Sequence, residues 1–109
     1  MCLPGNFEHL ASLEDVLLDF LRNSQAELVV CSSRPPNLNL PHRFEAWGEV
    51  REKEVLRHVD IGLMPLKDTA YARGKCGLKI LQYMAAEAVA VASAVGVNCS
   101  IIDHEKNGL

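Results

Sequence analysis

The sequence predicts an α/β fold that is Rossmann-like, with a mainly parallel sheet and helices on both faces. Short apolar runs rich in β-branched residues, at 27–32 and 89–94, are typical of buried strands. Segments with apolar residues at helical spacing lie between such runs. Strands that alternate with helices are joined by crossover connections and therefore run parallel. A chain of 109 residues holds at most one small domain, so we expect a single, partial domain over residues 1–109.

The first half of the chain predicts one helix and two strands. Apolar residues recur at helical spacing from Leu10, so a helix should run to about Asn23. Either Asn6 or Ser12 can cap its start, which leaves the first turn open. The strand at 27–32 follows. The remaining segments of this half are a proline-rich loop at 34–41 and a second strand at 42–47.

The second half continues the alternation. A charged helix is expected over 49–59, where Glu49 and Lys53 stand at a spacing that supports an ion pair. After it come a strand at 60–66, a basic loop at 67–75, a helix at 77–86, a strand at 89–94 and a short helix that Asn98 or Ser100 caps. Because helical crossovers separate them, the strands near 27–32, 61–66 and 89–94 are expected to be parallel neighbours in one sheet.

Composition excludes several classes of protein. The formal net charge of -3 and the pI near 5.7 argue against general nucleic-acid binding. No apolar run is long enough for a transmembrane helix, and no signal peptide is visible, so we expect a cytoplasmic protein. The four cysteines form no CxxC pair and have no histidine at a metal-ligand spacing, so we expect reduced thiols and no metal site.

A local positive island stands out in this acidic chain. Residues 69–86 contain no Asp or Glu but hold three cations, Arg73, Lys75 and Lys79. Gly77 lies in the turn that leads into the helix, whose N-terminus presents backbone N–H groups and the positive end of a dipole. Cations at a helix N-terminus favour an anion, and a phosphate or diphosphate is the natural ligand. Solvated basic side chains on a plain surface loop are the alternative.

An amide side chain stands beside these cations. Lys79 and Gln82 are three residues apart and so share one face of the helix. Gln82 is therefore placed one turn beyond the cations, where it could bind a sugar or ribose hydroxyl. A basic loop between a parallel strand and a helix is the usual ligand position in open α/β sheets.

Four stretches carry a resemblance to a known family. They read DIGLMPL, ARGKCGLKILQYMAA, VAVASAVGVN and KNGL, and they span about Trp47 to Leu109. Together they resemble the group-one (family 4) glycosyltransferases, in the bacterial branch with an RGKCG motif. The resemblance implies the C-terminal, donor-binding domain of a two-domain GT-B hexosyltransferase. It further implies a nucleotide-diphosphate sugar as donor, a retaining transfer, and neither a cofactor nor a tightly bound metal.

The resemblance assigns roles to positions of this chain. Arg73 and Lys75 would contact the diphosphate or the transferred sugar, and Lys79 would lie near the phosphates. Gln82 stands where many members carry a Glu that binds the ribose hydroxyls. The expected donor-binding residues are Arg73, Gly74, Lys75, Gly77, Lys79 and Gln82, with Gly5 and Asn6 as a candidate donor loop. No catalytic residue is expected within this chain.

Besides Gln82, the sequence departs from the family at four positions. Gly74 stands where many members carry an earlier Glu, so that carboxylate is absent here. Glu87 replaces the usual Gly just past the helix, where a left-handed residue costs least for glycine. Val89 and Ala94 replace two prolines.

Both ends of the chain look cut, so a piece of a larger protein is expected. The missing part would be an N-terminal domain that completes the cleft, and the fragment would be inactive on its own. Exposed sheet edges would then favour self-association. The alternative is a non-catalytic α/β module that binds phosphate or a nucleotide, or that serves only as a protein-interaction surface.

Overall fold

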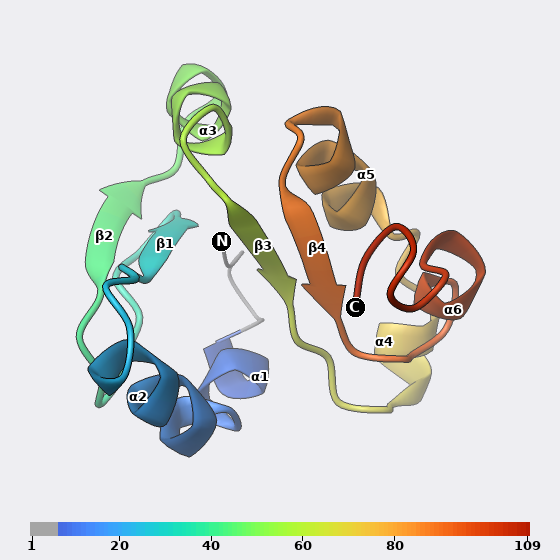
Figure 1. The fold of residues 1–109 in the computed structure, drawn as a ribbon, viewed down its shortest axis with the longest axis horizontal. Helices are drawn as coiled ribbons and strands as arrows, with labels where there is room; N and C mark the ends of the chain where they lie inside the picture. The colour runs from blue at the N-terminus through green and yellow to red at the C-terminus, as the bar shows by residue number, and fades with distance from the viewer. Residues whose placement is uncertain (1–6) are drawn as a thin grey trace. The chain divides into compact units, whose positions relative to one another are not determined.

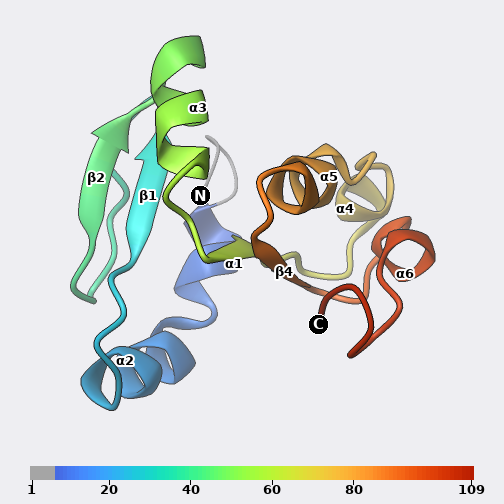
Figure 2. The ribbon, with the colours of Figure 1, turned by 45° about the horizontal axis from the view of Figure 1, so that its top comes forward.

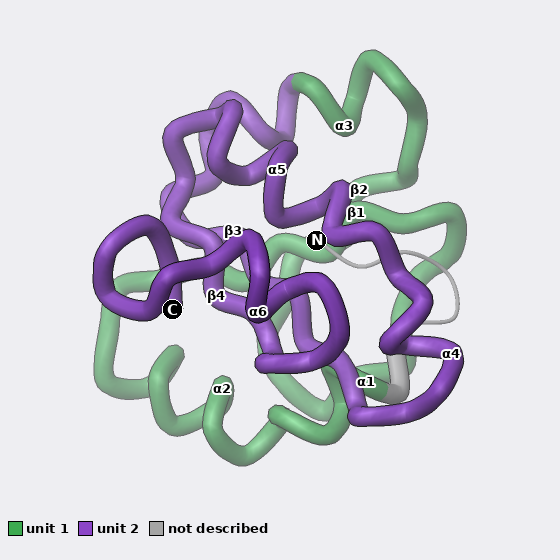
Figure 3. Tube along the Cα trace, turned by 90° about the vertical axis from the view of Figure 1, so that its right-hand side faces the viewer, with its two compact units in different colours: residues 1–53 green, residues 54–109 purple. Residues whose placement is uncertain are grey.

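The computed structural model describes residues 7–109 (Figure 1). They form two compact units that divide between residues 53 and 54 (Figure 3). The candidate donor loop at Gly5 and Asn6 lies outside the described residues. The expectation of a single domain over 1–109 stays a prediction.

The first unit contains two helices and one pair of parallel strands. Its elements are α1 (Phe7–Ala11), α2 (Glu14–Arg22), β1 (Val29–Ser32) and β2 (Arg43–Ala46). β1 and β2 pair in parallel, with Val30 opposite Phe44. Buried Leu10 and Val30 form its core, and the partly buried side chains of Leu17, Leu28 and Leu38 pack against them.

The single helix predicted up to Asn23 is broken near Ser12. The Ser12 hydroxyl donates a hydrogen bond to the carbonyl oxygen of His9 at 2.6 Å, and the Leu13 N–H bonds to Leu10 O at 3.0 Å. These bonds close the last turn of α1, so α2 begins afresh with Glu14 and Asp15 in its first turn. Two carboxylates suit the positive end of a helix dipole. The apolar periodicity continues across the break, which is why it predicted one helix.

The second unit holds the other pair of parallel strands and three helices. Its elements are β3 (Ile61–Met64), α4 (Ala70–Arg73), α5 (Leu78–Ala85), β4 (Val89–Ala92) and α6 (Asn98–Ile101), while α3 (Glu49–Leu56) spans the division between the units. β3 and β4 pair in parallel with Ile61 opposite Val89, and α5 packs against both strands (Figures 1 and 2). The predicted α/β class with parallel strands is confirmed.

Each unit contains one parallel pair of strands. β1 pairs with β2, and β3 pairs with β4. The expected parallel pairing of 61–66 with 89–94 is confirmed. The expected place of 27–32 beside 61–66 would join the two units and stays a prediction.

Tyr83 fixes α5 on the β3–β4 pair. Its side chain is fully buried, and its hydroxyl donates to Leu63 O at 3.1 Å. The ring lies against Gly62, where a Cβ atom would collide with it. Glycine at position 62 therefore lets the helix approach the strand closely, and this contact fixes the last turn of α5 on β3.

The C-terminus of α5 confirms the expected left-handed position. Glu87 has φ 61°, and its N–H bonds to Met84 O at 3.0 Å. The Ala88 N–H bonds to Tyr83 O at 2.9 Å. These two bonds form a Schellman motif, in which the residue after the helix cap is left-handed and usually glycine. Glu87 thus occupies a conformation that is unfavourable for a residue with a side chain.

Candidate functional site

The basic segment, residues 67–79, follows β3 and leads into α5. Part of it is helical, so the prediction of a plain loop over 67–75 was wrong. Thr69 caps α4, because its hydroxyl oxygen accepts a hydrogen bond from the Ala72 N–H at 3.1 Å. α4 ends at Gly74 after a single turn, and the chain then reaches α5 through three residues.

Gly77 makes the turn into α5. It has φ 70° and ψ 15°, which is left-handed backbone. A Cβ atom there would collide with Ile101 and stand 3.3 Å from Val97 Cγ1, so both the conformation and the space demand glycine. Within the described residues no side chain caps this helix start. The N-terminal turn of α5 therefore offers the backbone donors that the sequence predicted for an anion.

Arg73 is engaged by an acid that the sequence analysis did not consider. Its guanidinium forms a bidentate ion pair with the Asp68 carboxylate, with Nε–Oδ1 at 2.6 Å and Nη2–Oδ2 at 2.9 Å. The hydrogen bond from Arg73 lowers the pKa of Asp68, and the same bond raises the pKa of Arg73. Asp68 directly precedes residues 69–86, which contain no Asp or Glu. The turn of α4 brings the Arg73 side chain close to Asp68.

Lys75 contacts the aromatic side chain one helical turn before it. Its Nζ lies 5.3 Å from the centroid of the Tyr71 ring, within range of a cation–π interaction. Tyr71 is 77% exposed, whereas Lys75 is half-buried. The ammonium group is thus held beside an accessible aromatic ring at the surface of the basic segment.

Gln82 contains a buried acceptor. Its Oε1 is inaccessible to solvent and has no hydrogen-bond donor among the described residues. Such an orphan atom costs about 1–3 kcal/mol. Because water cannot reach Oε1, the atom belongs to the packing of α5 and is not an open ligand contact. Lys79 and Gln82 both lie on α5, as predicted, and both are half-buried.

The loop after β4 supports the basic segment, which the sequence analysis did not foresee. Gly96 has φ 59°, and a Cβ atom there would stand 2.8 Å from Arg73 O. The fully buried Asn98 secures this loop, since its Nδ2 donates to Ser93 O at 2.9 Å. The expectation that Asn98 or Ser100 caps a helix was wrong: both lie within α6, Val97 is at the N-cap position, and no side chain among the described residues caps this helix. The backbone at Arg73 is therefore braced from a segment more than twenty residues later in the chain.

Two structural absences bear on the chemistry. Across residues 7–109, no group of three or more His, Cys, Asp or Glu side chains could hold a metal ion. Over the same residues, none of the helices has the length and apolar character needed to cross a membrane.

A comparison with protein families now bears on this arrangement. The model of the family described as "Glycosyl transferases group 1" matches residues 6–109. The chain belongs to this family. The match extends the resemblance found over residues 47–109 to nearly the whole glycosyltransferase chain. Comparisons with curated proteins and with solved structures gave no significant match.

Proposed function

We propose that this glycosyltransferase domain binds the nucleotide-diphosphate sugar donor of a retaining transfer. One observation carries the proposal: the left-handed turn at Gly77 delivers a basic segment to the N-terminus of α5, directly after the parallel strand β3. Ligands of open α/β sheets bind beyond the carboxyl ends of their strands, and phosphates bind at helix N-termini. The family match supports sugar transfer as the chemistry.

Each donor-binding residue receives a role from its chemistry. Arg73 and Lys75 would bind the diphosphate, and Lys79 in the first turn of α5 would add to the positive field there. Gln82, which is half-buried on the same helix, would bind a ribose hydroxyl through its amide. In place of a metal, these cations would stabilise the negative charge that develops on the departing diphosphate.

We further propose that this chain binds the donor without transferring the sugar. Residues 69–86 contain no His, Asp or Glu, so neither an imidazole nor a carboxylate in the basic segment after Asp68 or in α5 is available to deprotonate an acceptor hydroxyl. Transfer also needs donor and acceptor held in one geometry, which a second domain would provide. We assign the whole enzyme to the cytoplasm and to the RGKCG-motif bacterial branch on the resemblance stated above.

Titration calorimetry with a nucleoside diphosphate and with the bare nucleoside tests the proposal. Arg73→Ala and Lys75→Ala should each lower the affinity for the diphosphate about tenfold and leave the affinity for the nucleoside unchanged. Gln82→Ala should lower the affinity for both ligands about threefold, because both contain the ribose that Gln82 is proposed to bind. Arg57→Ala, an exposed cation of the same unit, is the control and should change nothing.

Two results would contradict this assignment. Equal weakening of the nucleoside by all three variants would show that the phosphate end is misplaced. Absence of any diphosphate binding would favour a non-catalytic module. The Asp68–Arg73 ion pair also supports that alternative, because it engages Arg73, one of the two residues expected to bind the diphosphate. Acceptor-dependent release of nucleotide by this chain would overturn the separate proposal that it transfers no sugar.

A further inference from the structure

We propose that Tyr71 is the stacking surface for the sugar ring of the donor, and that it favours a pyranose with its C–H groups gathered on one face. Tyr71 lies on α4, between β3 and the N-terminus of α5, so it belongs to the segment that holds the proposed phosphate-binding residues. This role rests on the proposed donor site and adds a residue that recognises the transferred group.

The Tyr71 side chain is the most exposed of the large apolar side chains among residues 7–109. Its exposure is 77%, so most of the apolar surface of its ring is uncovered. The next residue, Ala72, is buried in a cluster with Leu66 and Val95. Single exposed apolar side chains are common on proteins, so what sets Tyr71 apart is its surroundings.

α4 holds the Tyr71 ring on a fixed base. The Thr69 side chain caps its start, and buried Ala72 anchors it in the core. At its end, the backbone of Gly96 lies so close that a Cβ atom there would stand 2.8 Å from Arg73 O. Because these three contacts secure α4, a ligand that packs on Tyr71 does not have to order the backbone beneath it.

Lys75 supplies a charge beside the ring. Its Nζ lies over the Tyr71 ring, 5.3 Å from the centroid. The opposite face stays accessible because the side chain is so exposed. The face of an aromatic ring is electron-rich and attracts the C–H groups of a pyranose, while an ammonium group attracts phosphate. A sugar joined to a diphosphate satisfies both groups, whereas a diphosphate alone uses only the ammonium.

The order of the proposed contacts along the chain agrees with the order of groups in the ligand. Gln82 on α5 is proposed to bind the ribose, and Lys75 with the first turn of α5 the diphosphate. Tyr71 lies one helical turn before Lys75. A nucleotide sugar contains its ribose, diphosphate and sugar in this sequence, so the sugar extends from the phosphates toward α4.

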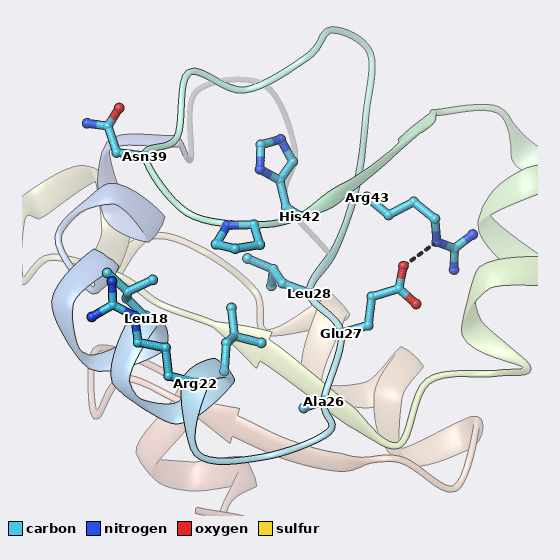
Figure 4. Close-up of a pocket in the computed structure, with 10 residues that line it drawn as sticks. Leu18, Arg22, Ala26, Glu27, Leu28, Asn39, His42 and Arg43 are labelled. Atoms are coloured by element: carbon cyan, nitrogen blue, oxygen red, sulfur yellow. Dashed lines mark hydrogen bonds and ion pairs between the residues drawn. The ribbon is translucent and has the colours of Figure 1, made fainter.

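A hollow in the first unit is an alternative position for a sugar. It has a volume of about 590 Å³, and its walls come from α2, the segment leading into β1 and the loop leading into β2 (Figure 4). None of its lining residues is Phe, Tyr or Trp, and Arg43 Nε pairs there with Glu27 Oε1 at 2.9 Å. The hollow therefore lacks a large aromatic surface for a stacked sugar, and a carboxylate already engages that guanidinium.

Calorimetry with UDP, GDP and ADP, and with UDP-glucose, GDP-mannose and ADP-glucose, tests the role of Tyr71. For the nucleotide that binds, Tyr71→Leu should lower the affinity for the nucleotide sugar about five- to tenfold and for the diphosphate less than about twofold. Tyr71→Phe keeps the ring and should leave both affinities unchanged. Phe20→Leu, which removes an exposed aromatic ring from the first unit, is the control and should also change neither.

Proton NMR on the unaltered chain gives a second readout. Sugar C–H protons that stack on an aromatic ring should move upfield on binding and show nuclear Overhauser contacts to the Tyr71 ring protons. The upfield shift should persist in Tyr71→Phe and vanish in Tyr71→Leu. These contacts need no variant, so the test remains decisive if Tyr71→Leu fails to fold.

The outcomes separate this role from the donor site itself. Diphosphate binding with no selective loss for the nucleotide sugar in Tyr71→Leu would refute the role of Tyr71 and leave the donor site standing. Equal losses for both ligands would show that the ring acts only through Lys75. Amide shifts confined to residues 18–43 would place the sugar in the hollow of the first unit. Failure of all three diphosphates to bind would refute the donor site, and the role of Tyr71 with it.

Discussion

Replacing Glu87 with glycine should stabilise the fold. Glu87 has φ 61° and follows α5 at the left-handed position of a Schellman motif. Its side chain is exposed, so the substitution removes no buried contact. What changes is the backbone: an L-residue in the left-handed region is disfavoured by contact between its Cβ atom and the following carbonyl, a contact that glycine lacks.

Two opposing terms set the size of the effect. Relieving the left-handed conformation is worth about 1–2 kcal/mol. Glycine also increases the conformational entropy of the unfolded chain, which costs about 0.4–1 kcal/mol. The net gain should be about 0.5–1 kcal/mol in the free energy of unfolding. For a chain of this size that corresponds to a rise in Tm of about 2–8 °C.

Urea unfolding of the Glu87→Gly variant measures this gain directly. The midpoint should rise while the m-value stays constant, since the exposed surface does not change. Glu87→Ala is the matched control, because it removes the charge but keeps the Cβ atom, and it should give no comparable gain. Glu105 has φ 63°, so Glu105→Gly should behave like Glu87→Gly. Equal stabilisation by Ala and Gly at position 87, or none by Gly, would refute the conformational argument.

Four further outcomes follow from other parts of the structure. Asp68→Asn should raise diphosphate affinity about two- to fivefold, because it releases Arg73 from an exposed ion pair; unchanged affinity in calorimetry would show that the pair does not compete with the ligand. The stabilisation from the Asp68–Arg73 pair should be complete above pH 3.8, the ordinary pKa of Asp68, and should be lost as the pH falls through the lowered pKa of this group in the folded chain. Acid unfolding at low and at high salt measures this loss. Gly62→Ala should cost about 3 kcal/mol in urea unfolding because its Cβ would collide with Tyr83, whereas Gly48→Ala, with open space around it, should cost far less. Exposed sheet edges and the half-exposed Leu78 and Leu81 should promote self-association, which a single monomeric species in concentrated sedimentation runs would contradict.

Local chemistry explains what the sequence predicted well. The apolar runs gave the strands to within three residues at each end, and the helix predicted at 77–86 is α5 (Leu78–Ala85). Glycine after RGKC predicted a turn, and Gly77 is left-handed. The departure at Glu87 pointed to a left-handed residue, and the structure has one. Each of these signals lies within a few neighbouring residues, where periodicity and backbone preference act.

Tertiary contacts explain what the sequence did not predict. The Tyr83–Gly62 contact and the Gly96–Arg73 contact each join residues more than twenty positions apart, and no periodic pattern reports them. The ion pair of Arg73 with Asp68 forms because the single turn of α4 brings the two side chains together. The glycine and lysine residues of this segment had predicted a loop instead of that turn. Charge counting over 69–86 therefore overstated how much positive charge is left for a ligand.

Gln82→Met should change stability and binding in opposite directions. Methionine has a similar length but no polar oxygen, so it removes the buried Oε1 that has no donor among the described residues. An unsatisfied buried acceptor costs about 1–3 kcal/mol, and part of that gain is lost because methionine fits the space less well. The free energy of unfolding should therefore rise by about 1 kcal/mol. Affinity for a nucleoside diphosphate should fall about three- to tenfold, because the ribose hydroxyl loses its amide partner.

The opposite signs make this substitution informative about the site. The stability term reports whether Oε1 is unsatisfied in the fold, and the affinity term reports whether the amide of Gln82 binds the ribose. Gln25→Met, at an exposed position of the first unit, is the control and should leave both quantities unchanged. Lower stability of Gln82→Met would show that the amide is satisfied within the fold. Higher stability with unchanged nucleotide affinity would show that the orphan oxygen is a defect of packing and that the ribose binds elsewhere.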